Sequence, residues 1–174
     1  MSEADLEGKN EQPMNFQWAG SLETFQSILE KQGWHTAPDL SPLGAMGWLA
    51  PEPDISTLPI LPQVNNGQHQ ELLLVSPQLQ ADDRLVVLRL WPSSMEILDT
   101  NTPVWTGSVV YLYLEQDLPL VAYLRTTADF ETPPKHLKEA LNQAENIGLT
   151  QRTRKTVNKQ IQWGGEVLLF REID

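Results

Sequence analysis

The chain of 174 residues contains no cysteine. This absence excludes disulfide bonds, thiolate nucleophiles, iron-sulfur clusters and every zinc site built on cysteine ligands. It does not fix the compartment, because a cysteine-free protein tolerates both reducing and oxidising surroundings. Stability must therefore come from a packed core, and a hydrophobic content of 40% is sufficient for one domain of this length.

Positive charge is also scarce. The chain has 12 Lys and Arg against 23 Asp and Glu, a formal net charge of -11. Such a field repels polyphosphates, so we expect no nucleic-acid partner. The one concentrated basic stretch, residues 151–159, contains Arg152, Arg154 and Lys155. It is either a docking site for an anionic headgroup or phosphorylated ligand, or a solvated loop or edge strand whose charges deter edge pairing.

Long hydrophobic runs are missing as well. The longest, residues 72–75 and 109–114, have the length of strands. We therefore expect no direct transmembrane insertion by this chain. Residues 1–13 are acidic and polar and are predicted to be a disordered lead-in or linker, followed by a single domain over residues 14–174.

Catalytic signatures are absent from the sequence. There is no nucleophile elbow, phosphate-binding loop or dinucleotide-binding glycine motif. His35, His69 and His136 have no metal-binding spacing and are expected at the surface. We therefore expect no catalytic residue, no metal and no cofactor, and this chain alone is not expected to be an enzyme.

Helical periodicity is present in three places. Ser21 is a plausible N-cap for a helix with an apolar stripe, and Gly33 suits the position just after its end. A second, short helix is expected over residues 41–49 and a third over residues 134–147.

The middle of the chain reads as strands separated by short turns, which favours antiparallel pairing. An Asn66-Gly67 pair signals a tight turn just before them. We predict an α+β fold, a largely antiparallel sheet of about five or six strands with two or three helices packed on it. The predicted strands are residues 72–76, 85–91, 96–98, 105–114, 118–126 and 166–171.

The strand over residues 85–91 combines apolar side chains with one charge. Period-two alternation places Arg89 on the same face as Leu85, Val87 and Trp91. The other face is apolar too, so this strand is expected to be central. Its expected partner carries Trp105, which would bring Trp91 and Trp105 within reach of each other. Both tryptophans are either core or rim aromatics, or the lining of an aromatic groove or a membrane-facing belt.

Tryptophan is plentiful, with six residues that stand in short phrases of fixed order. This series resembles the LssY C-terminal domain family over residues 14–125. The phrases that carry the resemblance are Asn-Phe-Gln-Trp-Ala-Gly-Ser-Leu at 15–22, Gln-Gly-Trp at 32–34, Leu-Pro-Ile-Leu-Pro at 58–62, Asn-Gly at 66–67, Leu-Arg-Leu-Trp at 88–91 and Pro-Val-Trp-Thr-Gly-Ser-Val at 103–109.

The resemblance implies a membrane context. Domains of this family typically follow the membrane-embedded segments of bacterial DedA-like or type 2 phosphatidic acid phosphatase proteins. It implies a soluble domain tethered to the bacterial inner membrane, with the cytoplasmic side favoured, and a partner in the membrane-embedded portion of its own or a neighbouring protein. The function expected from this context is a non-catalytic accessory, regulatory or ligand-binding domain.

The alternative is a small hydrolase that processes a phosphate or lipid headgroup. Arg89, Arg125 or the basic stretch would then hold the phosphate, because the guanidinium fork matches phosphate oxygens. An open cleft that holds both Arg89 and Arg125 would favour this alternative.

Overall fold

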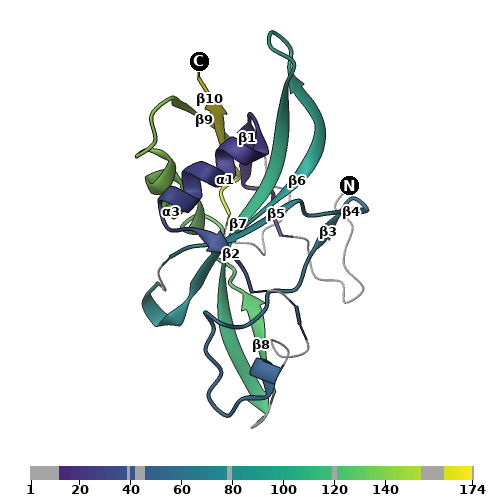
Figure 1. Ribbon diagram of the computed structural model, residues 1–174, viewed down its shortest axis with the longest axis vertical. Helices are drawn as coiled ribbons and strands as arrows, with labels where there is room; N and C mark the ends of the chain where they lie inside the picture. The colour runs from purple at the N-terminus through teal and green to yellow at the C-terminus, as the bar shows by residue number, and fades with distance from the viewer. Residues whose placement is uncertain are drawn as a thin grey trace.

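The computed structural model describes residues 12–38, 40–41, 46–77, 80–118, 121–153 and 163–173. These residues form an eight-stranded mixed sheet, a separate two-stranded hairpin and two α-helices (Figure 1). The strands of the main sheet are β1 (Phe16–Ala19), β2 (His35–Thr36), β5 (Leu72–Val75), β6 (Leu85–Ile97), β7 (Thr102–Leu118), β8 (Val121–Thr126), β9 (Ile147–Thr153) and β10 (Glu166–Glu172).

The order in the sheet is β2-β5-β6-β7-β1-β10-β9, with β8 also paired to β7. All pairs are antiparallel except β1 and β10, which run parallel. The predicted α+β class fits, but the prediction of about five or six strands was too low. It missed β1, β2 and β9, because the first two are very short and the third is mostly exposed and polar.

Local signals place α1 (Leu22–Lys31) correctly. The Ser21 hydroxyl accepts a hydrogen bond from the Thr24 amide at 3.0 Å, as an N-cap does. Gly33 follows the helix with a φ of +86°, which a glycine adopts without strain. The Asn66-Gly67 turn joins β3 (Val64–Asn65) to β4 (Gln68–His69).

The third predicted helix is shorter than expected. α3 spans Pro133–Leu141, and the residues that follow turn into β9 instead of continuing to residue 147. Asn146 makes that turn with a φ of +65°. In the region of the second predicted helix, the 3-10 helix η1 spans Gly47–Leu49, while residues 42–45 lie outside the described ranges.

The sheet separates two apolar cores. On one face, α1 and α3 pack over a core that includes Phe16, Trp18, Phe25 and Leu88 (Figure 1). The second core, on the other face, has no described helix of comparable length over it. Its members on the strands are Val87, Val110 and Leu112. The loop before α3 adds Phe130, and the segment between η1 and β3 adds Ile55 and Ile60.

The long strand β7 changes its neighbour halfway along its length. Residues 104–107 pair with β1, whereas residues 112–118 pair with β8. The fully buried side chain of Asn15 fills the interval between them. Its Nδ2 donates to the carbonyl oxygens of Val109 at 2.9 Å and Phe130 at 3.2 Å, and its Oδ1 accepts from the Val109 amide at 2.8 Å. A side-chain amide thus takes the place of a strand residue on the free edge of β7.

Replacing Asn15 is therefore expected to be costly. In Asn15→Leu the volume is nearly kept, but the buried amide and carbonyl of Val109 lose their partners, and each orphaned group costs about 1–3 kcal/mol. We expect the free energy of unfolding, measured by urea denaturation, to fall by about 3 kcal/mol. The exposed amide of Asn142 provides the control, because Asn142→Leu should change stability by no more than about 0.5 kcal/mol. Equal effects of the two substitutions would contradict this role of Asn15.

Candidate functional site

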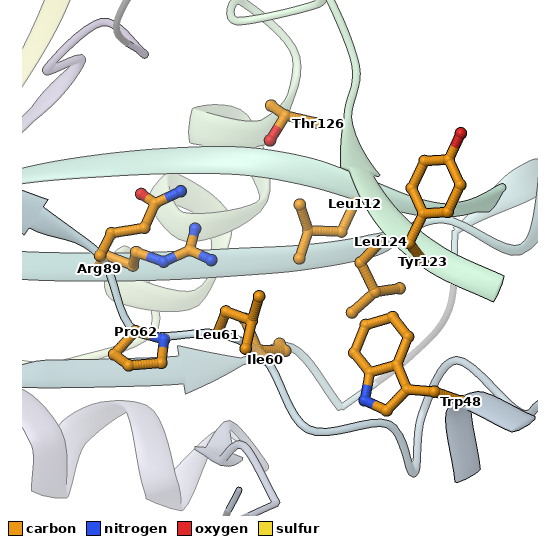
Figure 2. A pocket seen from close by; sticks show the side chains of 10 residues that line it. Trp48, Ile60, Leu61, Pro62, Arg89, Leu112, Tyr123, Leu124 and Thr126 are labelled. Atoms are coloured by element: carbon orange, nitrogen blue, oxygen red, sulfur yellow. The ribbon is translucent and has the colours of Figure 1, made fainter. Parts of the chain in front are cut away.

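A cavity of about 490 Å³ lies on the face of the sheet that carries the second core. Its walls come from three separate parts of the chain: η1 with the segment at residues 60–63, the central strands β6 and β7, and β8 (Figure 2). The apolar lining residues are Trp48, Ile60, Leu61, Pro62, Leu112 and Leu124. The polar lining residues are Gln63, Arg89, Tyr123 and Thr126.

The strand register places Arg89 on the cavity wall. Arg89 lies on β6, opposite Leu73 of β5 and Ser108 of β7, and shares its face with Val87 and Trp91. Its side chain is only 2% exposed. Figure 2 shows its guanidinium pointing toward Leu112 and Ile60. The predicted alternation along residues 85–91 is confirmed, and it sets one charge within an apolar face.

The guanidinium of Arg89 has buried nitrogens without hydrogen-bond partners among the described residues, namely Nε and Nη1. The same is true of Ser108 Oγ, directly opposite on β7, and of Trp91 Nε1, two residues along β6. Buried polar groups in proteins are nearly always paired, so unpaired ones call for a specific explanation such as a bound ion or water. Three neighbouring side chains on one face thus have buried polar atoms without a hydrogen-bond partner among the described residues.

Burial also affects the charge of Arg89. Desolvation lowers the pKa of its guanidinium to about 10, so the group is still a cation at neutral pH. The cavity lining described above contains no aspartate or glutamate to compensate it. A buried cation without a counter-charge costs several kcal/mol, and a bound anion would offset that cost.

Arg125 lies outside this cavity. It is exposed on β8, forms an ion pair with Glu115, and its guanidinium lies 5.2 Å from the ring centre of Tyr123. Its hydrogen bond to the Tyr123 hydroxyl is the main cause that raises the pKa of Arg125. The structure therefore does not bring Arg89 and Arg125 together. The strands β6 and β8 are not neighbours, since both pair with β7.

The two tryptophans on β6 and β7 are separated by the sheet. The predicted pairing of their strands is confirmed, but Trp91 lies opposite Thr106, so Trp105 projects to the other face. Trp91 is 2% exposed, and the half-buried Trp105 packs against the helix-side core. Its Nε1 donates to the Gly20 carbonyl at 3.2 Å. The expectation that the two rings lie within reach of each other was wrong, because Trp105 comes one residue before the position opposite Trp91 and successive side chains along a strand point to opposite faces.

The remaining candidate residues are basic. Arg152 is exposed on β9, the edge strand of the sheet, which agrees with the edge-strand interpretation. Arg154 and Lys155 lie outside the described residues. Arg152 is not among the described residues that line the cavity.

His136 belongs to a second polar cluster, on the helix side. His35 and His69 are exposed as expected, whereas His136 is half-buried and its Nε2 lies 2.7 Å from the Tyr111 hydroxyl. The Arg84 guanidinium lies 4.6 Å from the Tyr111 ring centre. Burial is the main cause that raises the pKa of Tyr111, so the phenol stays protonated at neutral pH and the contact ties α3 to β7.

Trp48, Tyr123 and Leu124 contribute to the cavity, although none of them was a predicted site residue. Nothing in the local pattern connects residue 48 with residues 89 and 124, because only the folded chain brings them together.

The comparisons with known proteins give one match. The family model described as LssY C-terminus matches residues 2–161. Neither the curated proteins nor the solved structures contain a match. In the part of the chain that the structure describes, no helix has the length and apolarity required to cross a bilayer.

The charge of Arg89 predicts an unusual response to substitution. The folded-state pKa lies below the ordinary arginine value, so the charged form costs folding free energy at every pH below about 10, and the cost fades as the pH rises through that value. Arg89→Met should therefore raise the free energy of unfolding of the ligand-free protein by roughly 1–3 kcal/mol at pH 7.

Denaturant titration of protein refolded in anion-poor buffer measures this change. Arg125→Met provides the matched control, and because Arg125 is exposed we expect no gain from that substitution. A loss of several kcal/mol in Arg89→Met would mean that the guanidinium has stabilising partners and would contradict its uncompensated burial.

Proposed function

This chain belongs to the LssY C-terminal domain family, and we propose that it is a non-catalytic domain that binds a small anionic ligand in the Arg89 cavity and serves as an accessory part of a larger bacterial inner-membrane protein. The observation that carries the proposal is the buried guanidinium of Arg89, which lines the cavity and whose Nε and Nη1 have no partner in the part of the chain that the structure describes. An anion there would supply both the missing hydrogen bonds and the missing counter-charge.

Binding is favoured over hydrolysis by the composition of the cavity wall. Hydrolysis of a phosphate ester needs a nucleophile or activated water and a base within hydrogen-bond reach. Among the described residues that line the cavity there is no histidine, aspartate, glutamate or lysine. Ser108 lies beside Arg89, but its hydroxyl has no base as a partner among the described residues. The hydrolase alternative also relied on two converging arginines, and Arg125 is paired elsewhere.

Anion binding predicts Arg89-dependent stabilisation. We expect inorganic phosphate, titrated at constant ionic strength, to raise the melting temperature of the wild-type protein. At a concentration a hundredfold above the dissociation constant, the gain in unfolding free energy would be about 2.7 kcal/mol. Arg89→Met should abolish the gain and Arg125→Met should keep it, since only Arg89 lines the cavity. If phosphate still raises the melting temperature of Arg89→Met, the anion binds at a different site.

The accessory role is proposed from the family context, and a partner in the membrane-embedded portion of the same or a neighbouring protein follows from it. The test is co-purification of the domain with that portion in detergent. We expect association, together with altered activity of the membrane protein when the domain is deleted. Absence of association combined with unchanged activity would contradict the role, while leaving anion binding to be judged by the phosphate titration.

A further inference from the structure

We propose that the natural ligand of the Arg89 cavity is an amphiphile, with an anionic head held by Arg89 and a single short hydrocarbon tail held by the apolar walls. This inference rests on the proposed binding function and specifies its ligand class. It follows from the way in which polar and apolar groups are distributed along the cavity.

Figure 2 shows a polar and an apolar end. Arg89 lies on one side, while the Trp48 indole and Leu124 lie on the other. The elements that carry Trp48 and Leu124, η1 and β8, contact each other at this apolar end. Ile60 and Leu112 of the second core form the wall between the two ends. A ligand that reaches from Arg89 to Trp48 therefore meets one cation and then mainly apolar side chains, with Gln63, Tyr123 and Thr126 as the uncharged polar residues of the lining.

Burial along the lining indicates the orientation of the ligand. Arg89 and Ile60 are buried, whereas Leu61 is 59% exposed and Pro62 is exposed as well. The charge of the lining thus lies at depth, while residues 61–62 reach the solvent. A head group that pairs with Arg89 sits inside, and the tail that follows it covers Trp48 and the exposed Leu61.

Each half of such a ligand leaves part of the cavity unsatisfied, so the two halves together should bind more tightly than either alone. A neutral hydrocarbon would leave the cation of Arg89 without a counter-charge, which is the costly state. A bare phosphate would pair with Arg89 but leave the apolar walls in contact with water. The volume of about 490 Å³ lies within the 300–1,000 Å³ typical of small-molecule sites and has room for a head group with one short chain.

A homologous series of probes tests the inference. We would titrate methyl, butyl, hexyl and octyl phosphate, all below their micellar concentrations, and follow melting temperature and tryptophan fluorescence. Each methylene buried should tighten binding about threefold to fourfold until the cavity is filled. Octyl glucoside, which has the same tail without the charge, should bind far more weakly than octyl phosphate.

Substitutions separate the two ends of the site. Arg89→Met should abolish binding of the whole series. Trp48→Ala should flatten the dependence on chain length and leave methyl phosphate binding unchanged. Leu61→Ser, at an exposed position that is not needed for folding, should weaken octyl phosphate more than methyl phosphate. Arg125→Met is the charge-matched control and should behave as wild type.

The outcomes distinguish the two proposals. If methyl and octyl phosphate bind equally well and both depend on Arg89, the amphiphile inference is overturned and the anion-binding function stands. If no probe shows Arg89-dependent binding, the binding function itself fails. Steep chain-length dependence that is lost in Trp48→Ala supports the inference.

The same chemistry is offered by a dissolved amphiphile and by a single-chain lipid that leaves a bilayer. A second arm therefore presents decyl phosphate either in solution or in phosphatidylcholine vesicles. Arg89-dependent stabilisation by the dissolved probe alone identifies a free amphiphile as the source. Stabilisation by the vesicle-bound probe identifies a bilayer as a source, and its absence in both arms overturns the inference.

Discussion

The side-chain amide of Asn15 stabilises β7 at the position where its pairing partner changes from β1 to β8. Between the start of β1 and the end of β8, its amide bonds both backbone groups of Val109 and the carbonyl of Phe130. Its own backbone carbonyl accepts from Leu168 of β10 at 3.1 Å. One buried residue thus provides hydrogen bonds to backbone groups of β7, of β10 and of the loop at Phe130. As a result, β7 forms part of the helix-covered region of the sheet and then continues toward the cavity.

The two faces of the sheet are covered in different ways. On one face, α1 and α3 close the core with large aromatic side chains, and Trp18 satisfies its indole on the Ser21 carbonyl. The opposite face is covered by an extended segment with several prolines, which does not fill the space above Arg89. A helix packed there would have buried the sheet completely. The irregular cover instead leaves a small-molecule space next to an ionised group.

The features of this arrangement that depend on local sequence signals can be predicted from the sequence. Ser21 and Gly33 delimit α1, and period-two alternation from Leu85 to Trp91 correctly predicts that Arg89 lies on an apolar face. The rest depends on contacts between distant residues. β1 is only four residues long and becomes a strand because β7 and β10 flank it, and its register with Leu168 has no counterpart in local pattern. The cavity could not be predicted either, because it combines residues 48, 89 and 124, which are far apart in the sequence.

The uncompensated charge of Arg89 has a consequence for the life of the protein in a cell. A domain whose empty form carries a destabilising buried cation spends more time partly open than its ligand-filled form, and open molecules are those that proteases degrade. Occupancy of the cavity would then set how long each molecule survives. The steady-state amount of the domain would follow the supply of its ligand without any change in gene expression.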